Sequence, residues 1–145
     1  LPLARLYNLE RELDQALQEK IWLKSGGFLV IQQTEAFVAI DVNTGKHSSK
    51  KDAEENYKQI NREAALEIAR QLRLRNLSGM ILVDFINMKN TNDQSELLQY
   101  MGSLVRSDPM QTVVVDVTAL GIMEITRKKS SKTLAEQLLQ LKKGE

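Results

Sequence analysis

The segment Ala39-Ile40-Asp41-Val42-Asn43-Thr44-Gly45-Lys46 decides how we interpret the fold of this chain. An apolar run leads into Asp41, and a polar turn that contains a glycine follows. An apolar run bounded by turn residues is typical of a buried strand. Side chains alternate along a strand, so Asp41 and Asn43 are expected to project from the same face. An unpaired carboxylate is costly to bury, and we therefore expect Asp41 to meet water, a cation or a hydrogen-bond donor.

A second segment, Met80-Ile81-Leu82-Val83-Asp84-Phe85-Ile86-Asn87, repeats this arrangement, because another apolar run ends in an aspartate. If the two strands lie side by side, they place two carboxylates at one edge of a sheet. Such an edge suits a hard divalent cation, which prefers oxygen ligands. On the residues alone an alternative stays open, because an aspartate at a strand end is also a common turn or capping residue.

The composition is that of an ordinary globular domain, with 145 residues, 42% hydrophobic and 27% charged. No apolar run reaches the roughly 20 residues of a membrane-spanning helix. Cysteine is absent, which excludes disulfides and thiolate metal sites and fits a reducing, cytoplasmic location. The single histidine, His47, excludes an acid–base pair of two histidines within one chain. The net charge of +1 gives no global field towards nucleic acid, although the segment 127–143 is rich in lysine and arginine.

The order of the predicted elements indicates an α+β domain, with a central mixed β-sheet flanked by helices. Leucines spaced three and four apart predict a first helix that Ser25-Gly26-Gly27 ends. The order of strand, long helix and strand around residues 37–84 predicts a parallel pair. We expect helices over about 3–20, 52–72, 91–104 and 133–141, and strands over about 28–31, 37–41, 80–84, 112–115 and 122–126, with a capping box at 91–94.

Several separate segments occur in an order that is characteristic of one family. They are Ser-Gly-Gly at 25–27, Thr34-Glu35-Ala36, the segment 39–45, Glu67-Ile68-Ala69-Arg70-Gln71-Leu72-Arg73-Leu74-Arg75, Val83-Asp84-Phe85-Ile86, and Leu120-Gly121 with Glu124 and Thr126-Arg127. Through them residues 25–129 resemble the catalytic region of the ribonuclease E/G family, the subdomain described as deoxyribonuclease I-like.

The resemblance implies a hydrolytic endoribonuclease of RNA processing and decay, which uses Mg²⁺, or Mn²⁺ as an alternative, to cut single-stranded RNA. It implies that Asp41 and Asp84 are the metal-binding aspartates and that Asn43 supports the first of them. A competing interpretation is an RNA-binding or dimerisation module that has no activity of its own. The family packs this subdomain against its own copy, so a homodimer is expected.

The resemblance also divides the chain. It implies an N-terminal helix at 1–24 that joins to an upstream subdomain, a catalytic core at 25–129 and a basic C-terminal helix at 130–145. The family's S1 domain, its 5′-end-sensing region and its cysteine pair have no counterpart in this sequence, so no zinc site is expected. Asn87 and Ala119 stand where many members carry an aspartate and a basic residue.

Three basic residues are candidates for contacts with RNA phosphates. Lys46 lies in the polar turn after Asn43, and Arg127 and Lys128 follow a predicted strand that should neighbour the site. Each of them is also compatible with an ordinary surface position. Trp22, the one tryptophan, is expected to pack rather than to stack on a base.

Overall fold

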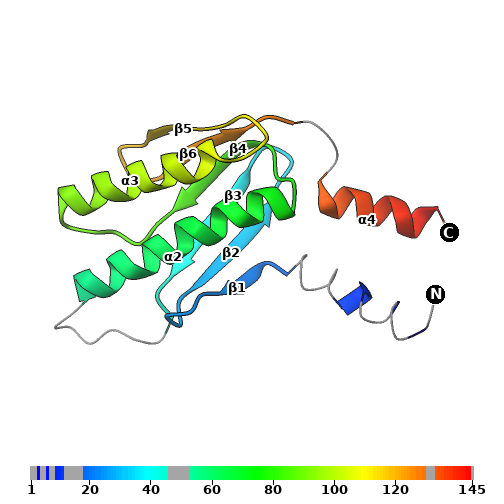
Figure 1. The fold of residues 1–145 in the computed structure, drawn as a ribbon, viewed down its shortest axis with the longest axis horizontal. Helices are drawn as coiled ribbons and strands as arrows, with labels where there is room; N and C mark the ends of the chain where they lie inside the picture. Colours follow the sequence, from blue (N-terminus) through cyan, green and yellow to red (C-terminus); the bar gives the residue numbers. More distant parts are fainter. Residues whose placement is uncertain are drawn as a thin grey trace.

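The computed structural model describes residues 18–45, 53–129 and 133–144, together with residues 3, 6 and 9–11 near the start of the chain. Within these residues the chain forms a six-stranded mixed sheet with helices, and this confirms the predicted α+β class (Figure 1). The elements in chain order are β1 (Lys20–Trp22), β2 (Phe28–Gln33), β3 (Val38–Asn43), α2 (Ala53–Leu74), β4 (Gly79–Asp84), α3 (Thr91–Arg106), β5 (Thr112–Val117), β6 (Met123–Arg127) and α4 (Leu134–Lys143).

The strands lie in the order β1-β2-β3-β4-β6-β5. The β2–β3 and β5–β6 pairs are antiparallel, and β3 and β4 are parallel because α2 connects them as a crossover. The predicted parallel pair is therefore confirmed. Because β3 and β4 run in the same direction, their carboxyl ends meet at one end of the sheet, and α4 lies towards the other end (Figure 1).

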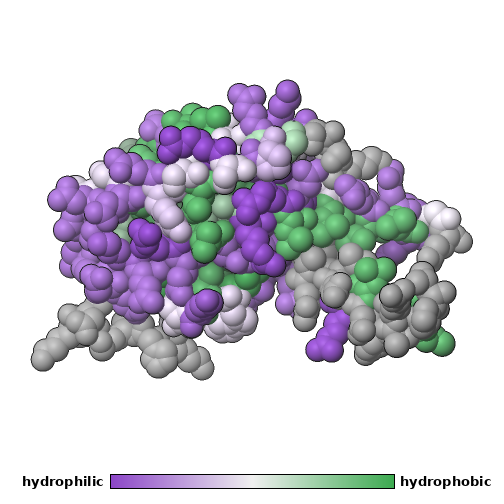
Figure 2. All heavy atoms as spheres, viewed as in Figure 1, coloured by the Kyte–Doolittle hydropathy of each residue, from purple (hydrophilic) through white to green (hydrophobic). Residues whose placement is uncertain are grey.

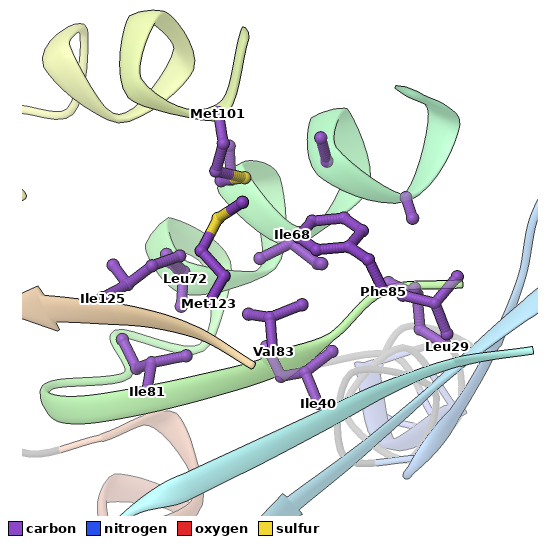
Figure 3. Packing of buried hydrophobic residues seen from close by; sticks show 14 of the residues in the cluster. Leu29, Ile40, Ile68, Leu72, Ile81, Val83, Phe85, Met101, Met123 and Ile125 are labelled. Carbon is purple, nitrogen blue, oxygen red and sulfur yellow. The ribbon is translucent and has the colours of Figure 1, made fainter. Parts of the chain in front are cut away.

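The hydrophobic core lies between one face of the sheet and the helices α2 and α3. Figure 3 shows Ile68 and Leu72 of α2 and Met101 of α3 pointing towards Val83 and Met123 of the sheet. The alternation of buried and exposed positions along β3, β4 and β6 assigns every second side chain to this core. The outer surface of α2 and α3 is mainly hydrophilic (Figure 2). The opposite face of the sheet carries side chains that are exposed or half-buried, including those of Asp41 and Asp84.

Polar contacts hold the two long helices together above the core. The Lys58 ammonium group lies 3.4 Å from an oxygen of Asp93 and 3.6 Å from an oxygen of Glu96. The Arg62 guanidinium lies 4.3 Å from the ring centroid of Tyr100. The three partners are all on α3, so these contacts connect α2 with α3.

Several predicted boundaries differ from the structure by one or more residues. The first helix does not reach residue 20, because Lys20–Trp22 forms strand β1 and pairs with β2. The cap of α3 lies one residue earlier than the predicted capping box, at Asn90, whose side chain accepts hydrogen bonds from the backbone N–H groups of Asn92 and Asp93. β5 extends to Val117, beyond the predicted end. No helix among the described residues is long and apolar enough to cross a membrane.

Candidate functional site

Asp41 and Asp84 are register partners at the carboxyl ends of the parallel strands β3 and β4. Neighbouring strands lie about 4.8 Å apart, and side chains at paired positions project from the same face. Both side chains are exposed on the face of the sheet opposite to the core. The structure therefore brings together the two carboxylates that the sequence placed at one sheet edge, while their role as metal ligands stays a prediction.

The electrostatics of this pair favour a bound cation. Burial raises the pKa of Asp84 above its ordinary value, and the negative charge of Asp41 raises it further. Ionising both groups at such a short separation is unfavourable, and a cation between them would relieve the repulsion. The Asn43 side-chain amide donates a hydrogen bond of 3.2 Å to Oδ2 of Asp41, which orients that carboxylate. Asp41, Asn43 and Asp84 thus form one polar group.

The turn after Asn43 is fixed by close backbone contacts with the turn at residues 25–27. A Cβ atom on Gly27 would lie 2.7 Å from the Asn43 carbonyl oxygen, and one on Gly45 would lie 2.5 Å from the Gly26 carbonyl oxygen. Gly45 also has a φ of +74°, which L side chains rarely adopt. Only glycine fits at both positions. Contacts between the two turns therefore hold the end of β3 in place.

The segment after Asp84 is held by Asn61 of α2, which sequence reasoning did not single out. The Asn61 side chain is fully buried, its amide nitrogen donates to the Ile86 carbonyl at 2.9 Å, and its oxygen accepts from the Ile86 N–H at 3.0 Å. Asn61 lies three and four residues before Ala64 and Ala65, on the buried side of the helix. A polar residue on an apolar stripe was the signal that could have identified it.

Replacing Asn61 with alanine is expected to lower the free energy of unfolding by about 1–3 kcal/mol, because both backbone groups of Ile86 lose their partner. Urea unfolding followed by circular dichroism measures the change. Gln59→Ala, an exposed position on the same helix, is the matched control and should stay within about 0.5 kcal/mol of the wild type. Equal unfolding midpoints for the two variants would contradict a positioning role for Asn61.

Arg127, predicted as an RNA contact, is instead a buried structural residue at the far end of the sheet. It is 4% exposed, and its guanidinium donates to the Asp108 carboxylate at 2.8 and 3.2 Å. A further nitrogen donates to the Asn76 side chain at 2.8 Å and to the Leu77 carbonyl at 3.1 Å. These bonds join β6 to the segments that follow α3 and α2, and they satisfy the buried guanidinium group.

The direction of β6 accounts for this correction. β6 does neighbour β4, as expected, but the pair is antiparallel, and Arg127 lies opposite Gly79 at the start of β4. The carboxyl end of β6 therefore points away from Asp84. Lys128 is exposed at that same distant end, where its backbone N–H donates to the Gln111 carbonyl. Lys46 and His47 lie outside the described residues.

The donor set at the sheet edge fits a magnesium ion. In the part of the chain that the structure describes, no three histidine, cysteine, aspartate or glutamate side chains cluster as a metal site would need, so the site offers the two carboxylates of Asp41 and Asp84. Mg²⁺ is commonly held by one or two carboxylates and completes its octahedral shell with waters and substrate phosphates. A pair of carboxylates is therefore a sufficient contribution from the protein.

Comparison with known proteins identifies the family. A sequence model described as "Ribonuclease E/G family" matches residues 1–130. The chain belongs to the ribonuclease E/G family. The match includes all six strands of the sheet and the Asp41–Asp84 pair, whereas α4 follows after its end.

Curated ribonucleases of this family align with nearly the whole chain. Ribonuclease G of Escherichia coli strain K12 is 39% identical over 137 residues, which are 94% of this chain and 28% of the relative. Ribonuclease E of Nostoc sp. is 38% identical over 135 residues, covering 93% of this chain and 20% of the relative. Ribonuclease E of Synechocystis sp. is 37% identical and covers the same 20% share of its length. The chain thus spans well under a third of these ribonuclease E/G proteins.

Proposed function

We propose that this chain carries the metal-binding centre of an endoribonuclease that hydrolyses single-stranded RNA. The observation that carries this proposal is the register pairing of Asp41 with Asp84 at the carboxyl ends of the parallel strands β3 and β4. The names of the aligned relatives, ribonuclease G and ribonuclease E, support RNA as the substrate. The homodimer and the Lys46 phosphate contact that the sequence suggested stay predictions.

In this proposal Asp41 and Asp84 hold one Mg²⁺ ion, or Mn²⁺ in its place. The bound ion would orient a phosphate of the RNA and lower the pKa of a water molecule for attack on it. Asn43 acts through Asp41, because its amide occupies one carboxylate oxygen and limits the orientations of the group. Asn61 acts at greater distance, because it fixes the backbone that follows Asp84.

A cleavage assay on a 5′-monophosphorylated, AU-rich single-stranded RNA tests the proposal. Cleavage is expected with Mg²⁺ and is expected to stop when EDTA removes the metal. The products should carry a 5′-phosphate and a 3′-hydroxyl, which end-labelling distinguishes. RNA that binds the chain with Mg²⁺ present but is never cut would favour the competing interpretation, a binding module without activity of its own.

A further inference from the structure

An aromatic pair with a lysine above it lies on the same face of the sheet as the two aspartates. Trp22 is 63% exposed, and its ring centroid lies 5.2 Å from that of Phe28, with the rings tilted by 58°. The Lys20 ammonium group lies 4.3 Å from the centroid of the Trp22 ring and 4.2 Å from that of Phe28. The sequence led us to expect that Trp22 packs rather than stacks on a base; it does pack against Phe28, but most of its surface is exposed.

Strand register connects this cluster with the proposed metal site. Trp22 pairs with Phe28 across β1 and β2, and Phe28 pairs with Asn43 across β2 and β3. Paired residues share a face, and Asn43 in turn donates to Asp41. Two strand spacings put Trp22 about 10 Å from Asn43. The aromatic surface and the carboxylates therefore belong to one continuous surface.

The composition of this cluster indicates which ligand it suits. Exposed apolar residues that are scattered singly are normal and carry no message. Here, however, the largely exposed Trp22 ring is backed by the Phe28 ring, and the Lys20 ammonium group lies over both. The cluster also lies on the same face of the sheet as the centre proposed to bind a phosphate. Proteins that bind single-stranded nucleic acid combine aromatic rings, on which bases stack, with basic groups that follow the backbone.

We propose that Trp22, backed by Phe28, stacks on a base of the bound RNA strand a short distance along the strand from the phosphate at Asp41 and Asp84, and that Lys20 contacts the adjoining phosphate. This rests on the proposed function for its ligand, single-stranded RNA. Stacking tolerates any base, because every base has an aromatic face. The platform would thus contribute affinity and position rather than sequence preference.

Trp22 is the only tryptophan of the chain, so its own fluorescence reports on the contact. The full chain is titrated, in EDTA to prevent cleavage, with a fluorescein-labelled single-stranded RNA of adenosines and uridines, and binding is followed in parallel by anisotropy. Tryptophan quenching should track the anisotropy change. An abasic oligonucleotide of the same length and charge should give little quenching when it is bound to the same occupancy.

Variants separate stacking from general charge attraction. Trp22→Ala is expected to weaken RNA binding about tenfold, and Trp22→Phe is expected to retain most of the affinity because it keeps an aromatic face. Met80→Ala is the matched control, because Met80 is 44% exposed and lies on the same face of the sheet near the distant end. It should bind like the wild type. Circular dichroism and urea unfolding of each variant verify that it is folded.

Several outcomes would overturn the platform. They are RNA that does not bind the chain, RNA that binds without quenching Trp22, or a Trp22→Ala variant with unchanged affinity. A shift of tryptophan emission with protein concentration, in the absence of RNA, would show that a second copy covers this surface instead. The result is separable from the proposed function. Cleavage without quenching would contradict stacking on Trp22 but support the nuclease activity. Quenching without cleavage in Mg²⁺ would support stacking on Trp22 but contradict the nuclease activity.

Discussion

Asp84→Asn is expected to abolish Mg²⁺-dependent cleavage while the metal-free protein keeps or gains stability. The substitution preserves the shape of the side chain but removes a charge that Asp41 disfavours, because the pKa of Asp84 is raised by burial and by Asp41. Loss of a residue that only supports a metal ligand typically costs about 10–100-fold in affinity or activity. Loss of a ligand is expected to cost at least about a hundredfold.

Thermal melts of wild type and Asp84→Asn, each with and without millimolar Mg²⁺, measure this effect beside the cleavage assay. A ligand that binds only the folded state raises the melting temperature, so the wild type should gain stability from Mg²⁺ and the variant should not. Asp116→Asn is the matched control, because Asp116 is an exposed aspartate on β5, which is separated from β4 by β6. Equal gains from Mg²⁺ in wild type and Asp84→Asn would rule out a site made of the two aspartates.

The centre of the site could be predicted from sequence because local patterns specify it. Each aspartate ends an apolar run of strand length, and the long helix between the runs implies a crossover and parallel strands. Those inferences place Asp41 beside Asp84, as the register shows. The alternation of side chains along a strand predicts that Asn43 projects from the same face as Asp41, and the hydrogen bond between the two side chains agrees with that.

The features that sequence analysis missed or misplaced depend on contacts between residues that are distant in the sequence. Ile21 continues the spacing of the leucines before it, but it belongs to β1, which forms because β2 offers an unpaired edge. Asn61 bonds to Ile86, which lies 25 residues away, and Arg127 bonds to Asp108, which lies 19 residues away. No local pattern reveals such partners. Basic residues near the end of the chain suggested RNA contacts, while the antiparallel direction of β6 decided where Arg127 lies.

Arg127→Met is expected to be strongly destabilising, by about 3–5 kcal/mol, because it leaves a buried carboxylate without its counterion. The side chains of Arg127 and Asp108 are 3% and 2% exposed. Urea unfolding at neutral pH measures the loss. Lys128→Met is the matched control, because Lys128 is the next residue and is exposed, and a change within about 0.5 kcal/mol is expected there. Comparable stability of the two variants would contradict a structural role for Arg127.

The pH dependence of the unfolding free energy of Arg127→Met tests whether the unpaired charge of Asp108 causes the destabilisation. Burial raises the pKa of Asp108, but hydrogen bonds from Arg127, the Met110 N–H and the Thr112 hydroxyl, with the charge of Arg127, outweigh it and hold the pKa below its ordinary value. A depressed pKa contributes stability above the unfolded-state value of about 4, and this contribution is lost as the pH falls through the folded-state pKa.

In Arg127→Met the effect of burial dominates, so Asp108 becomes protonated at a higher pH than in the wild type. Once Asp108 is protonated, the variant no longer bears the cost of a buried, unpaired carboxylate. The gap in unfolding free energy between wild type and Arg127→Met should thus be largest near neutral pH and should narrow in acid. A gap that stays constant from neutral to acid pH would show that lost packing, rather than the uncompensated charge of Asp108, causes the destabilisation.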